Sequence, residues 1–122
     1  MGKCELIYCA TPGRINDKKN EIMELVEEKG QAPFHPFQAF PYELFEGGEP
    51  GRENTIKFCK RAIDICDQFW LFGVSKGTLT ELNHAIEKEK QIKLFHEEFD
   101  PEWKEKYEEL KEDFDKPLER LD

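Results

Sequence analysis

No stretch of this 122-residue sequence approaches the run of roughly 20 apolar residues that a membrane-spanning helix needs, so we expect no membrane partner. The N-terminal residues show no signal-peptide architecture, which makes the cytoplasm the expected location. The four cysteines form no Cys-x-x-Cys pair, and no histidine stands at metal-ligand spacing from them. We therefore expect reduced, mostly buried thiols, and neither a metal ion nor a cofactor.

Basic residues are also scarce, with 18 Lys and Arg against 27 Asp and Glu and a formal net charge of −9. Binding to a nucleic acid polymer relies on a basic surface that displaces phosphate counterions, so the sequence disfavours that class of function. A small phosphorylated ligand is compatible with this charge, because one local cluster of amides and cations is enough to bind it. Hydrophobic residues make up 38% of the chain, which predicts one folded domain over residues 1–122.

Apolar runs and turn residues predict strands that alternate with helices. The expected strands are 4–10, 31–34, 68–73 and 91–95, and the expected helices are 16–30, 53–67, 79–90 and 100–115. This order predicts a Rossmann-like (flavodoxin-like) α/β fold, a parallel sheet of four or five strands with helices on both faces. Ligands of such sheets bind beyond the carboxyl ends of the strands. The segments 11–14, 34–42 and 73–78 leave those ends and should meet at one cleft.

The last predicted helix is amphipathic, with Asp100 as its expected N-cap and Pro101 at its first helical position. Its apolar residues form a single stripe, which covers either the protein's own sheet or that of a partner. The stripe consists of Trp103, Tyr107, Leu110 and Phe114.

The segment 73-GVSKGT-78 places several backbone amides, two hydroxyls and a lysine at a helix N-terminus, directly after the most apolar strand. Such a turn is a natural anion site. Glu81 follows Thr78 by three residues, and two interpretations of it compete. In the first, Thr78 and Glu81 form a capping box, which the local pattern favours. In the second, Glu81 is a reactive carboxylate beside a bound nucleotide.

A first strand ending in IYCA, followed by 66-CDQFWLFG-73, 75-SKGTLTEL-82 and 85-AIEKEKQIKLF-95, resembles the nucleoside 2-deoxyribosyltransferase superfamily. This superfamily includes the 2′-deoxynucleoside 5′-monophosphate N-glycosidases, and the resemblance covers roughly residues 4–95. It implies hydrolysis or transfer at the N-glycosidic bond of a nucleoside or a (deoxy)nucleoside 5′-monophosphate. It also implies a homodimer or a larger homo-oligomer.

The resemblance implies roles for individual residues. Glu81 matches the acid that attacks the anomeric carbon of the sugar, and Tyr8 matches a first-strand tyrosine that lies near this acid. Ser75 stands where nucleotide hydrolases of the superfamily carry a serine at the 5′-phosphate. The loop after the first strand, which contacts phosphate in those hydrolases, matches 11-TPGR-14. Together with the anion-binding turn, these matches give the expected substrate-binding residues Thr11, Gly13, Arg14, Ser75, Gly77 and Thr78.

Aromatic residues are dense at the predicted cleft edge. Two interpretations of them are equally open, stacking on the base of a nucleotide or a hydrophobic lid over the sheet edge. His35 precedes a proline, which favours an extended backbone, and a binding role and a plain loop role are comparable for it. The residues concerned are Phe34, His35, Phe37, Phe40 and Tyr42.

One departure from the superfamily concerns a second acid, which members carry before the aspartate that opens the central strand. The matching position here falls near Cys59, and residues 54–63 contain neither Asp nor Glu. Loss of a proton donor typically costs 10²–10⁴-fold in rate. A second hypothesis is therefore a non-catalytic nucleotide-binding module of the same fold. A third hypothesis, which we rank lower, is a phosphoribohydrolase that releases cytokinin-type bases. It is based on the similarity of GTLTE to the GGxGTxxE turn of those enzymes.

Overall fold

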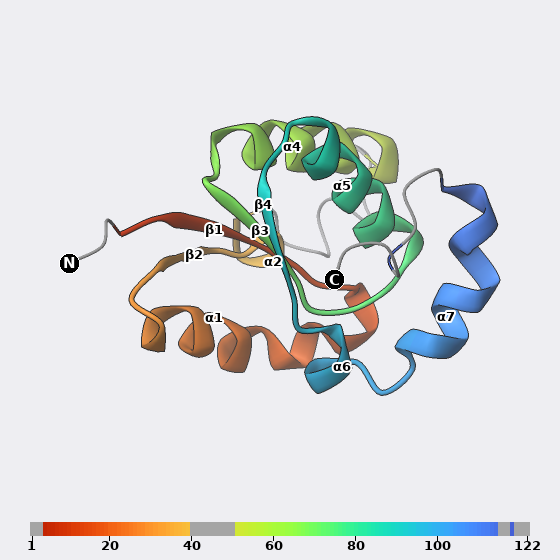
Figure 1. The fold of residues 1–122 in the computed structure, drawn as a ribbon, viewed down its shortest axis with the longest axis horizontal. Helices are drawn as coiled ribbons and strands as arrows, with labels where there is room; N and C mark the ends of the chain where they lie inside the picture. The colour runs from red at the N-terminus through yellow and green to blue at the C-terminus, as the bar shows by residue number, and fades with distance from the viewer. Residues whose placement is uncertain (1–3, 40–50, 115–117, 119–122) are drawn as a thin grey trace.

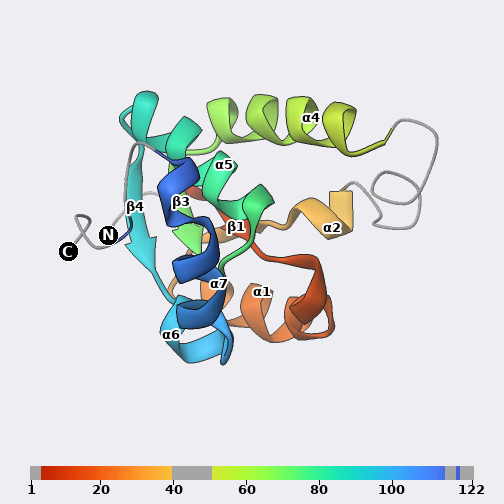
Figure 2. The same ribbon diagram turned by 90° about the vertical axis from the view of Figure 1, so that its right-hand side faces the viewer.

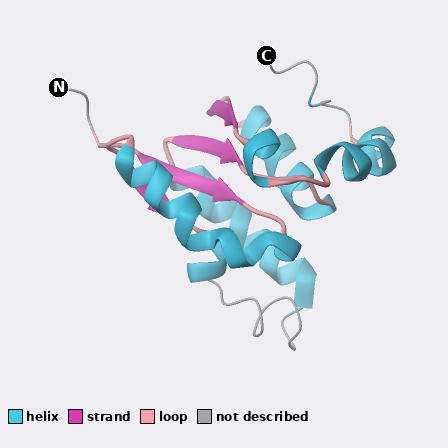
Figure 3. Ribbon diagram, turned by 90° about the horizontal axis from the view of Figure 1, so that it is seen from below, coloured by secondary structure: helices cyan, strands magenta, loops and turns pink. Residues whose placement is uncertain are grey.

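Four short apolar segments form a single parallel sheet in the order β2-β1-β3-β4. The computed structural model describes residues 4–39, 51–114 and 118 of the chain. All four strands of the described sheet run in the same direction (Figure 3). Their bounds are β1 (Leu6–Ala10), β2 (Ala32–Phe34), β3 (Gln68–Leu71) and β4 (Gln91–Leu94). The predicted Rossmann-like α/β fold is confirmed.

Helices cover both faces of this sheet (Figure 1). On one face lie α4 (Gly51–Ile65) and α5 (Lys76–Glu87). The opposite face packs against α1 (Lys19–Glu28), which follows the 3₁₀ turn η1 (Gly13–Lys18), and is also covered by α6 (His96–Phe99). The short α2 (Pro36–Ala39) follows β2, and α7 (Trp103–Leu110) with the 3₁₀ turn η2 (Lys111–Asp113) lies across the carboxyl ends of the strands (Figure 2).

The side chains of β1 alternate between two buried clusters, as the period of a strand requires. Tyr8 and Ala10 pack with α4 and α5, whereas Ile7 and Cys9 pack with α1. The β3 strand is buried at every position, which agrees with its continuous apolar sequence. Three of the four cysteines are buried free thiols, as expected, and Cys4 is exposed.

The end of the chain differs from the prediction. The helix expected from Asp100 begins instead at Trp103, because the backbone of Asp100 is extended and its side chain binds other segments. Tyr107 is buried in the cluster that contains β1 and β3, and Trp103 and Phe114 pack against the same cluster. The apolar stripe therefore covers the protein's own core. Within the described residues, no helix combines the length and the apolar character needed to cross a membrane.

The connections from β1 and β3 diverge, since β1 leads to β2 on one side and β3 leads to β4 on the other. A topological switch point of this kind leaves a crevice at the carboxyl ends of the two central strands. The loop after β1 and the turn after β3 meet there.

Candidate functional site

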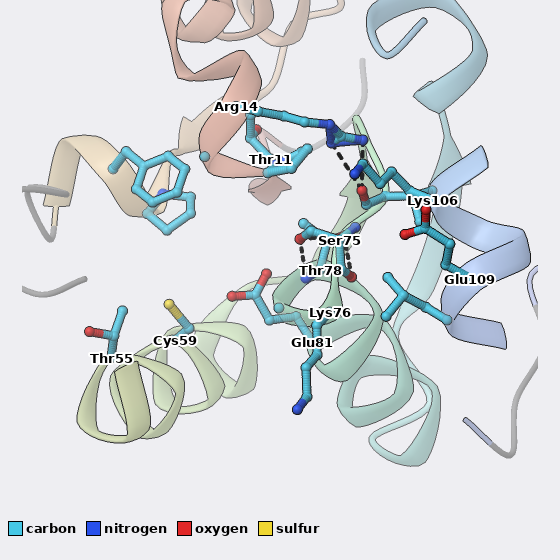
Figure 4. A pocket seen from close by; sticks show the side chains of 17 residues that line it. Thr11, Arg14, Thr55, Cys59, Ser75, Lys76, Thr78, Glu81, Lys106 and Glu109 are labelled. Carbon is cyan, nitrogen blue, oxygen red and sulfur yellow. Dashed lines mark hydrogen bonds between the residues drawn. The ribbon is translucent and has the colours of Figure 1, made fainter. Parts of the chain in front are cut away.

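A cavity of about 370 Å³ lies at this switch point. In the described part of the chain it is lined by the loop after β1, α2, α4, the turn that opens α5, and α7 (Figure 4). It brings together most of the residues that the sequence predicts for a binding site: Thr11, Gly13, Arg14, Phe37, Ser75, Gly77, Thr78 and Glu81. Tyr8, Phe34 and His35 lie behind its wall.

The N-terminus of α5 is capped by Ser75. Its Oγ accepts a hydrogen bond from the Thr78 amide at 3.1 Å, and the Thr78 Oγ1 accepts one from the Ser75 amide at 2.8 Å. The predicted capping box of Thr78 and Glu81 is therefore wrong. Because the helix begins at Lys76, Glu81 lies in its second turn, where the backbone amides already have intrahelical acceptors.

Glu81 is a carboxylate with only 8% of its surface exposed. The Tyr8 hydroxyl donates a hydrogen bond to its Oε2 at 3.0 Å. Figure 4 shows the Glu81 carboxylate pointing into the cavity between Cys59 and Ser75. Burying a carboxylate is costly unless hydrogen bonds compensate for its lost hydration. The fold thus holds an acid in a defined orientation at the cavity wall.

Tyr8 supports this acid from below the cavity surface. It is fully buried, and its ring is stacked between Phe34 and Phe69 with centroid distances of 5.9 and 5.5 Å. Burial raises the pKa of Tyr8 well above its ordinary value, and the adjacent Glu81 raises it further. The hydroxyl therefore stays protonated at neutral pH and acts as a permanent donor to the carboxylate.

The α4 wall lies opposite Ser75 and carries Thr55 and Cys59 into the cavity (Figure 4). Cys59 is 3% exposed and lies within hydrogen-bonding reach of the Tyr8 hydroxyl. Cys59, near which a second acid was expected, therefore lines the cavity. A thiol and a hydroxyl stand there in place of a carboxylate.

Phe34 and His35, two of the residues predicted to bind substrate, are not among the residues that line this cavity. Phe34 is paired in register with Tyr8 and turns its ring onto it, so it positions the tyrosine. His35 is buried, and its Nδ1 accepts a hydrogen bond from the amide of Phe37 at 3.2 Å. That bond fixes the turn into α2.

Among the described residues, Phe37 is the aromatic side chain that lines the cavity, and it does so from α2 beside Pro36. Burial lowers the pKa of His35 from 6.5 to about 4, so the imidazole behind Phe37 is neutral at physiological pH. Phe40 and Tyr42 lie outside the described residues.

Arg14 lines the cavity, but its guanidinium is engaged elsewhere. Both terminal nitrogens donate to the carbonyl oxygen of Val74 at 3.1 and 2.8 Å. Nη2 also binds Asp100 at 2.7 Å, and Nε binds Glu102 at 3.1 Å. Arg14 therefore clamps the loop after β1 to the turn after β3 and to the segment after β4.

Asp100, expected to cap a helix, completes this clamp instead. It is fully buried and also accepts from the amides of Val74 at 2.9 Å and Glu102 at 3.1 Å. A β-carbon on Gly73 would lie 2.5 Å from Pro12 Cδ and 3.1 Å from Asp100 Oδ2, so only glycine fits between them. The available signal was the position of Asp100, shortly after a strand whose carboxyl end borders the cleft.

The helix α7 contributes a further wall with Lys106, Glu109 and Leu110. No sequence signal marked them, because their spacing suits the solvent-facing side of an amphipathic helix. Among the residues that the structure describes, no cluster of three or more His, Cys, Asp or Glu side chains could hold a metal ion.

Residues 8–95 match a family described as Domain of unknown function (DUF7768). The chain belongs to this family. The DUF7768 match includes Tyr8, the turn that opens α5 and Glu81, and it ends before Asp100 and α7. No curated protein matches the chain.

Proposed function

We propose that this DUF7768 protein hydrolyses or transfers the N-glycosidic bond of a nucleoside or (deoxy)nucleoside 5′-monophosphate, with Glu81 as the nucleophile. The observation that carries the proposal is the position of Glu81, buried at the cavity wall, bonded to Tyr8 and without a capping role. The resemblance of residues 4–95 to the nucleoside 2-deoxyribosyltransferase superfamily points to the same chemistry.

Cleavage of an N-glycosidic bond passes through an oxocarbenium-like state, which a nearby carboxylate stabilises or captures. In the first step the bond between C1′ and the base nitrogen breaks, and its electron pair leaves with the base. A bond from a Glu81 oxygen to C1′ forms in its place. Water then attacks C1′ in a hydrolase, and a second base does so in a transferase. The hydrogen bond from Tyr8 to Oε2 orients the Glu81 carboxylate for this attack.

The turn that opens α5 supplies the matching site for a 5′-phosphate. Ser75 and Thr78 satisfy each other's amides, while those of Lys76 and Gly77 make no hydrogen bond among the described residues. Unpaired amides at a helix N-terminus attract anions. A phosphate bound at Gly77 would place the attached sugar toward Glu81, which lies one turn further along the same helix.

The test is the release of free base, measured by chromatography. The purified protein is incubated with a panel of nucleosides and 5′-monophosphates, both ribo and deoxy. We expect base from one class of substrate and a loss of more than about 10³-fold in rate for Glu81→Gln. Glu87→Gln is the matched control, since Glu87 is exposed on the same helix outside the cavity. An unchanged rate for Glu81→Gln contradicts the mechanism.

The composition of the α4 wall favours a second candidate, a non-catalytic module that holds a nucleotide. Among the described side chains of α4, Thr55 and Cys59 line the cavity, and neither carries a carboxyl group that could protonate the leaving base. The same incubation separates the two candidates. Ligand that stays bound with no free base after prolonged incubation supports the module, whereas multiple turnovers exclude it.

A further inference from the structure

The cavity has two unlike ends. The side lined by α2 and α4 carries Pro36, Phe37 and Cys59 and is largely apolar. The other side, with Arg14, Lys106 and Glu109, is charged (Figure 4). Figure 4 shows Lys106 and Glu109 reaching from α7 toward Arg14, with Ser75 beside them. Thr55 and Cys59 enter from the opposite side, and the Glu81 carboxylate lies between the two ends.

If the sugar of a nucleotide lies beside Glu81, the apolar and charged ends of the cavity favour one orientation of the nucleotide. Its base occupies the apolar end, and its 5′ group points to Ser75 and on to the charged end. The cation that meets the 5′ group there cannot be Arg14, since the carboxylates of Asp100 and Glu102 already neutralise its guanidinium. Lys106 is only partly exposed, and its ammonium forms no hydrogen bond or ion pair within the described part of the chain.

We infer that Lys106 is the residue that selects a 5′-monophosphate over a nucleoside, and that Glu109 disfavours a second phosphate. This inference rests on the proposed function and assigns the substrate preference of the same site. Lys76 belongs to the turn of α5, but its exposed side chain points away from Ser75 and Arg14 (Figure 4). With Arg14 committed to its clamp, Lys106 is therefore the cation that faces the 5′ group. Glu109 places a carboxylate at the far wall, where a β-phosphate would meet a like charge.

Both residues belong to α7, which lies beyond the DUF7768 match at residues 8–95. The proposed nucleophile and the anion-binding turn lie inside the match, so chemistry and phosphate selection come from different parts of the chain. Leu110 of α7 lines the same wall, and the buried Tyr107 anchors the helix to the core. The position of Lys106 is therefore set by packing.

Isothermal titration calorimetry tests the inference in the Glu81→Gln background, which prevents turnover. The probes are the common nucleosides, both ribo and deoxy, with their 5′-monophosphates and 5′-diphosphates. We expect Lys106→Met to weaken monophosphate binding by about 10-fold or more and to leave nucleoside binding unchanged. Glu109→Gln should strengthen diphosphate binding by about threefold or more, a change typical of removing one like charge. Lys104→Met is the matched control, because Lys104 is exposed on α7 outside this cavity.

The outcomes are distinguishable. Monophosphate affinity that does not change in Lys106→Met overturns the inference and leaves the proposed function standing. Equal diphosphate affinities of Glu109→Gln and its parent overturn the role of Glu109. If the parent binds none of the probes, the proposed function fails together with the inference. Unchanged nucleoside binding shows that each variant is folded.

Discussion

The clamp of Arg14 and Asp100 yields the sharpest stability prediction. Asp100 is fully buried and accepts three hydrogen bonds, from the Arg14 guanidinium and from the amides of Val74 and Glu102. Asp100→Ala removes all three acceptor contacts at once. It leaves the amide of Val74 buried without its partner and reduces the counter-charge of Arg14.

Removing one partner of a buried ion pair typically costs about 3–5 kcal/mol. The Arg14 side chain is 25% exposed and keeps its contacts with Glu102 and Val74, so the expected loss in free energy of unfolding is lower, about 2–4 kcal/mol. Asp100→Asn keeps one acceptor oxygen and should lose about 1–2 kcal/mol. Against a total stability of about 5–15 kcal/mol, the alanine variant is substantially weakened.

Urea unfolding measures these losses from the shift in midpoint at constant slope. Asp113→Ala, an exposed aspartate of the same C-terminal segment, should change stability by less than about 0.5 kcal/mol. Arg14→Met completes a double-mutant cycle in which we expect a coupling energy of about 1–3 kcal/mol. A loss below about 1 kcal/mol for Asp100→Ala, or a coupling near zero, refutes the clamp.

Three further predictions concern the segments around the cavity. Gly73→Ala should destabilise the fold by about 1–3 kcal/mol in urea unfolding, because its new methyl group overlaps the Pro12 ring. Ser75→Ala should cost about 1 kcal/mol in the same assay, since it deletes the N-cap that accepts from the Thr78 amide; an effect below about 0.3 kcal/mol would argue for a different helix start. Burial lowers the pKa of His35 from 6.5 to about 4, so between these two pH values the unfolded state binds more protons than the folded state. The free energy of unfolding should therefore fall by about 3 kcal/mol as the pH drops from the higher value to the lower. His35→Asn, which retains an acceptor for the next turn, should flatten this part of the profile measured by urea unfolding at pH 4–7.

The fold class was predictable from the sequence because the strands are short apolar segments that alternate with helices. The segment 68–73 is continuously apolar and occupies the buried centre of the sheet, and the alternation of strands with helices leaves few topologies other than a parallel sheet. The C-terminal helix was placed less well. Asp100 followed by a proline has the local signature of a helix start, but its carboxylate gains more from Arg14 and Val74 than from a cap.

The residues that leave the carboxyl ends of β1 and β3 were also predictable, since any parallel sheet brings these loops together. The part of the cavity wall that α7 supplies was not predictable from the sequence. Lys106 and Glu109 look like solvent-facing positions of an amphipathic helix, and their approach to the cavity depends on how α7 crosses the strand ends. That crossing is set by tertiary contacts such as the burial of Tyr107, which no local pattern encodes.

The start of α5 shows how a shift of one turn changes the interpretation of a functional residue. Ser75 and Thr78 are both good N-cap residues, so the local sequence cannot choose between them. The choice is made by the backbone around Gly73, whose carbonyl accepts from the Thr78 hydroxyl at 2.9 Å. With Ser75 as the N-cap, Glu81 accepts no capping hydrogen bond from a backbone amide. Its buried position beside Tyr8 therefore does not serve to start the helix. Burying a carboxylate at a cavity wall costs stability, and costly buried acids of this kind concentrate at functional sites, which is why Glu81 is the first residue to test.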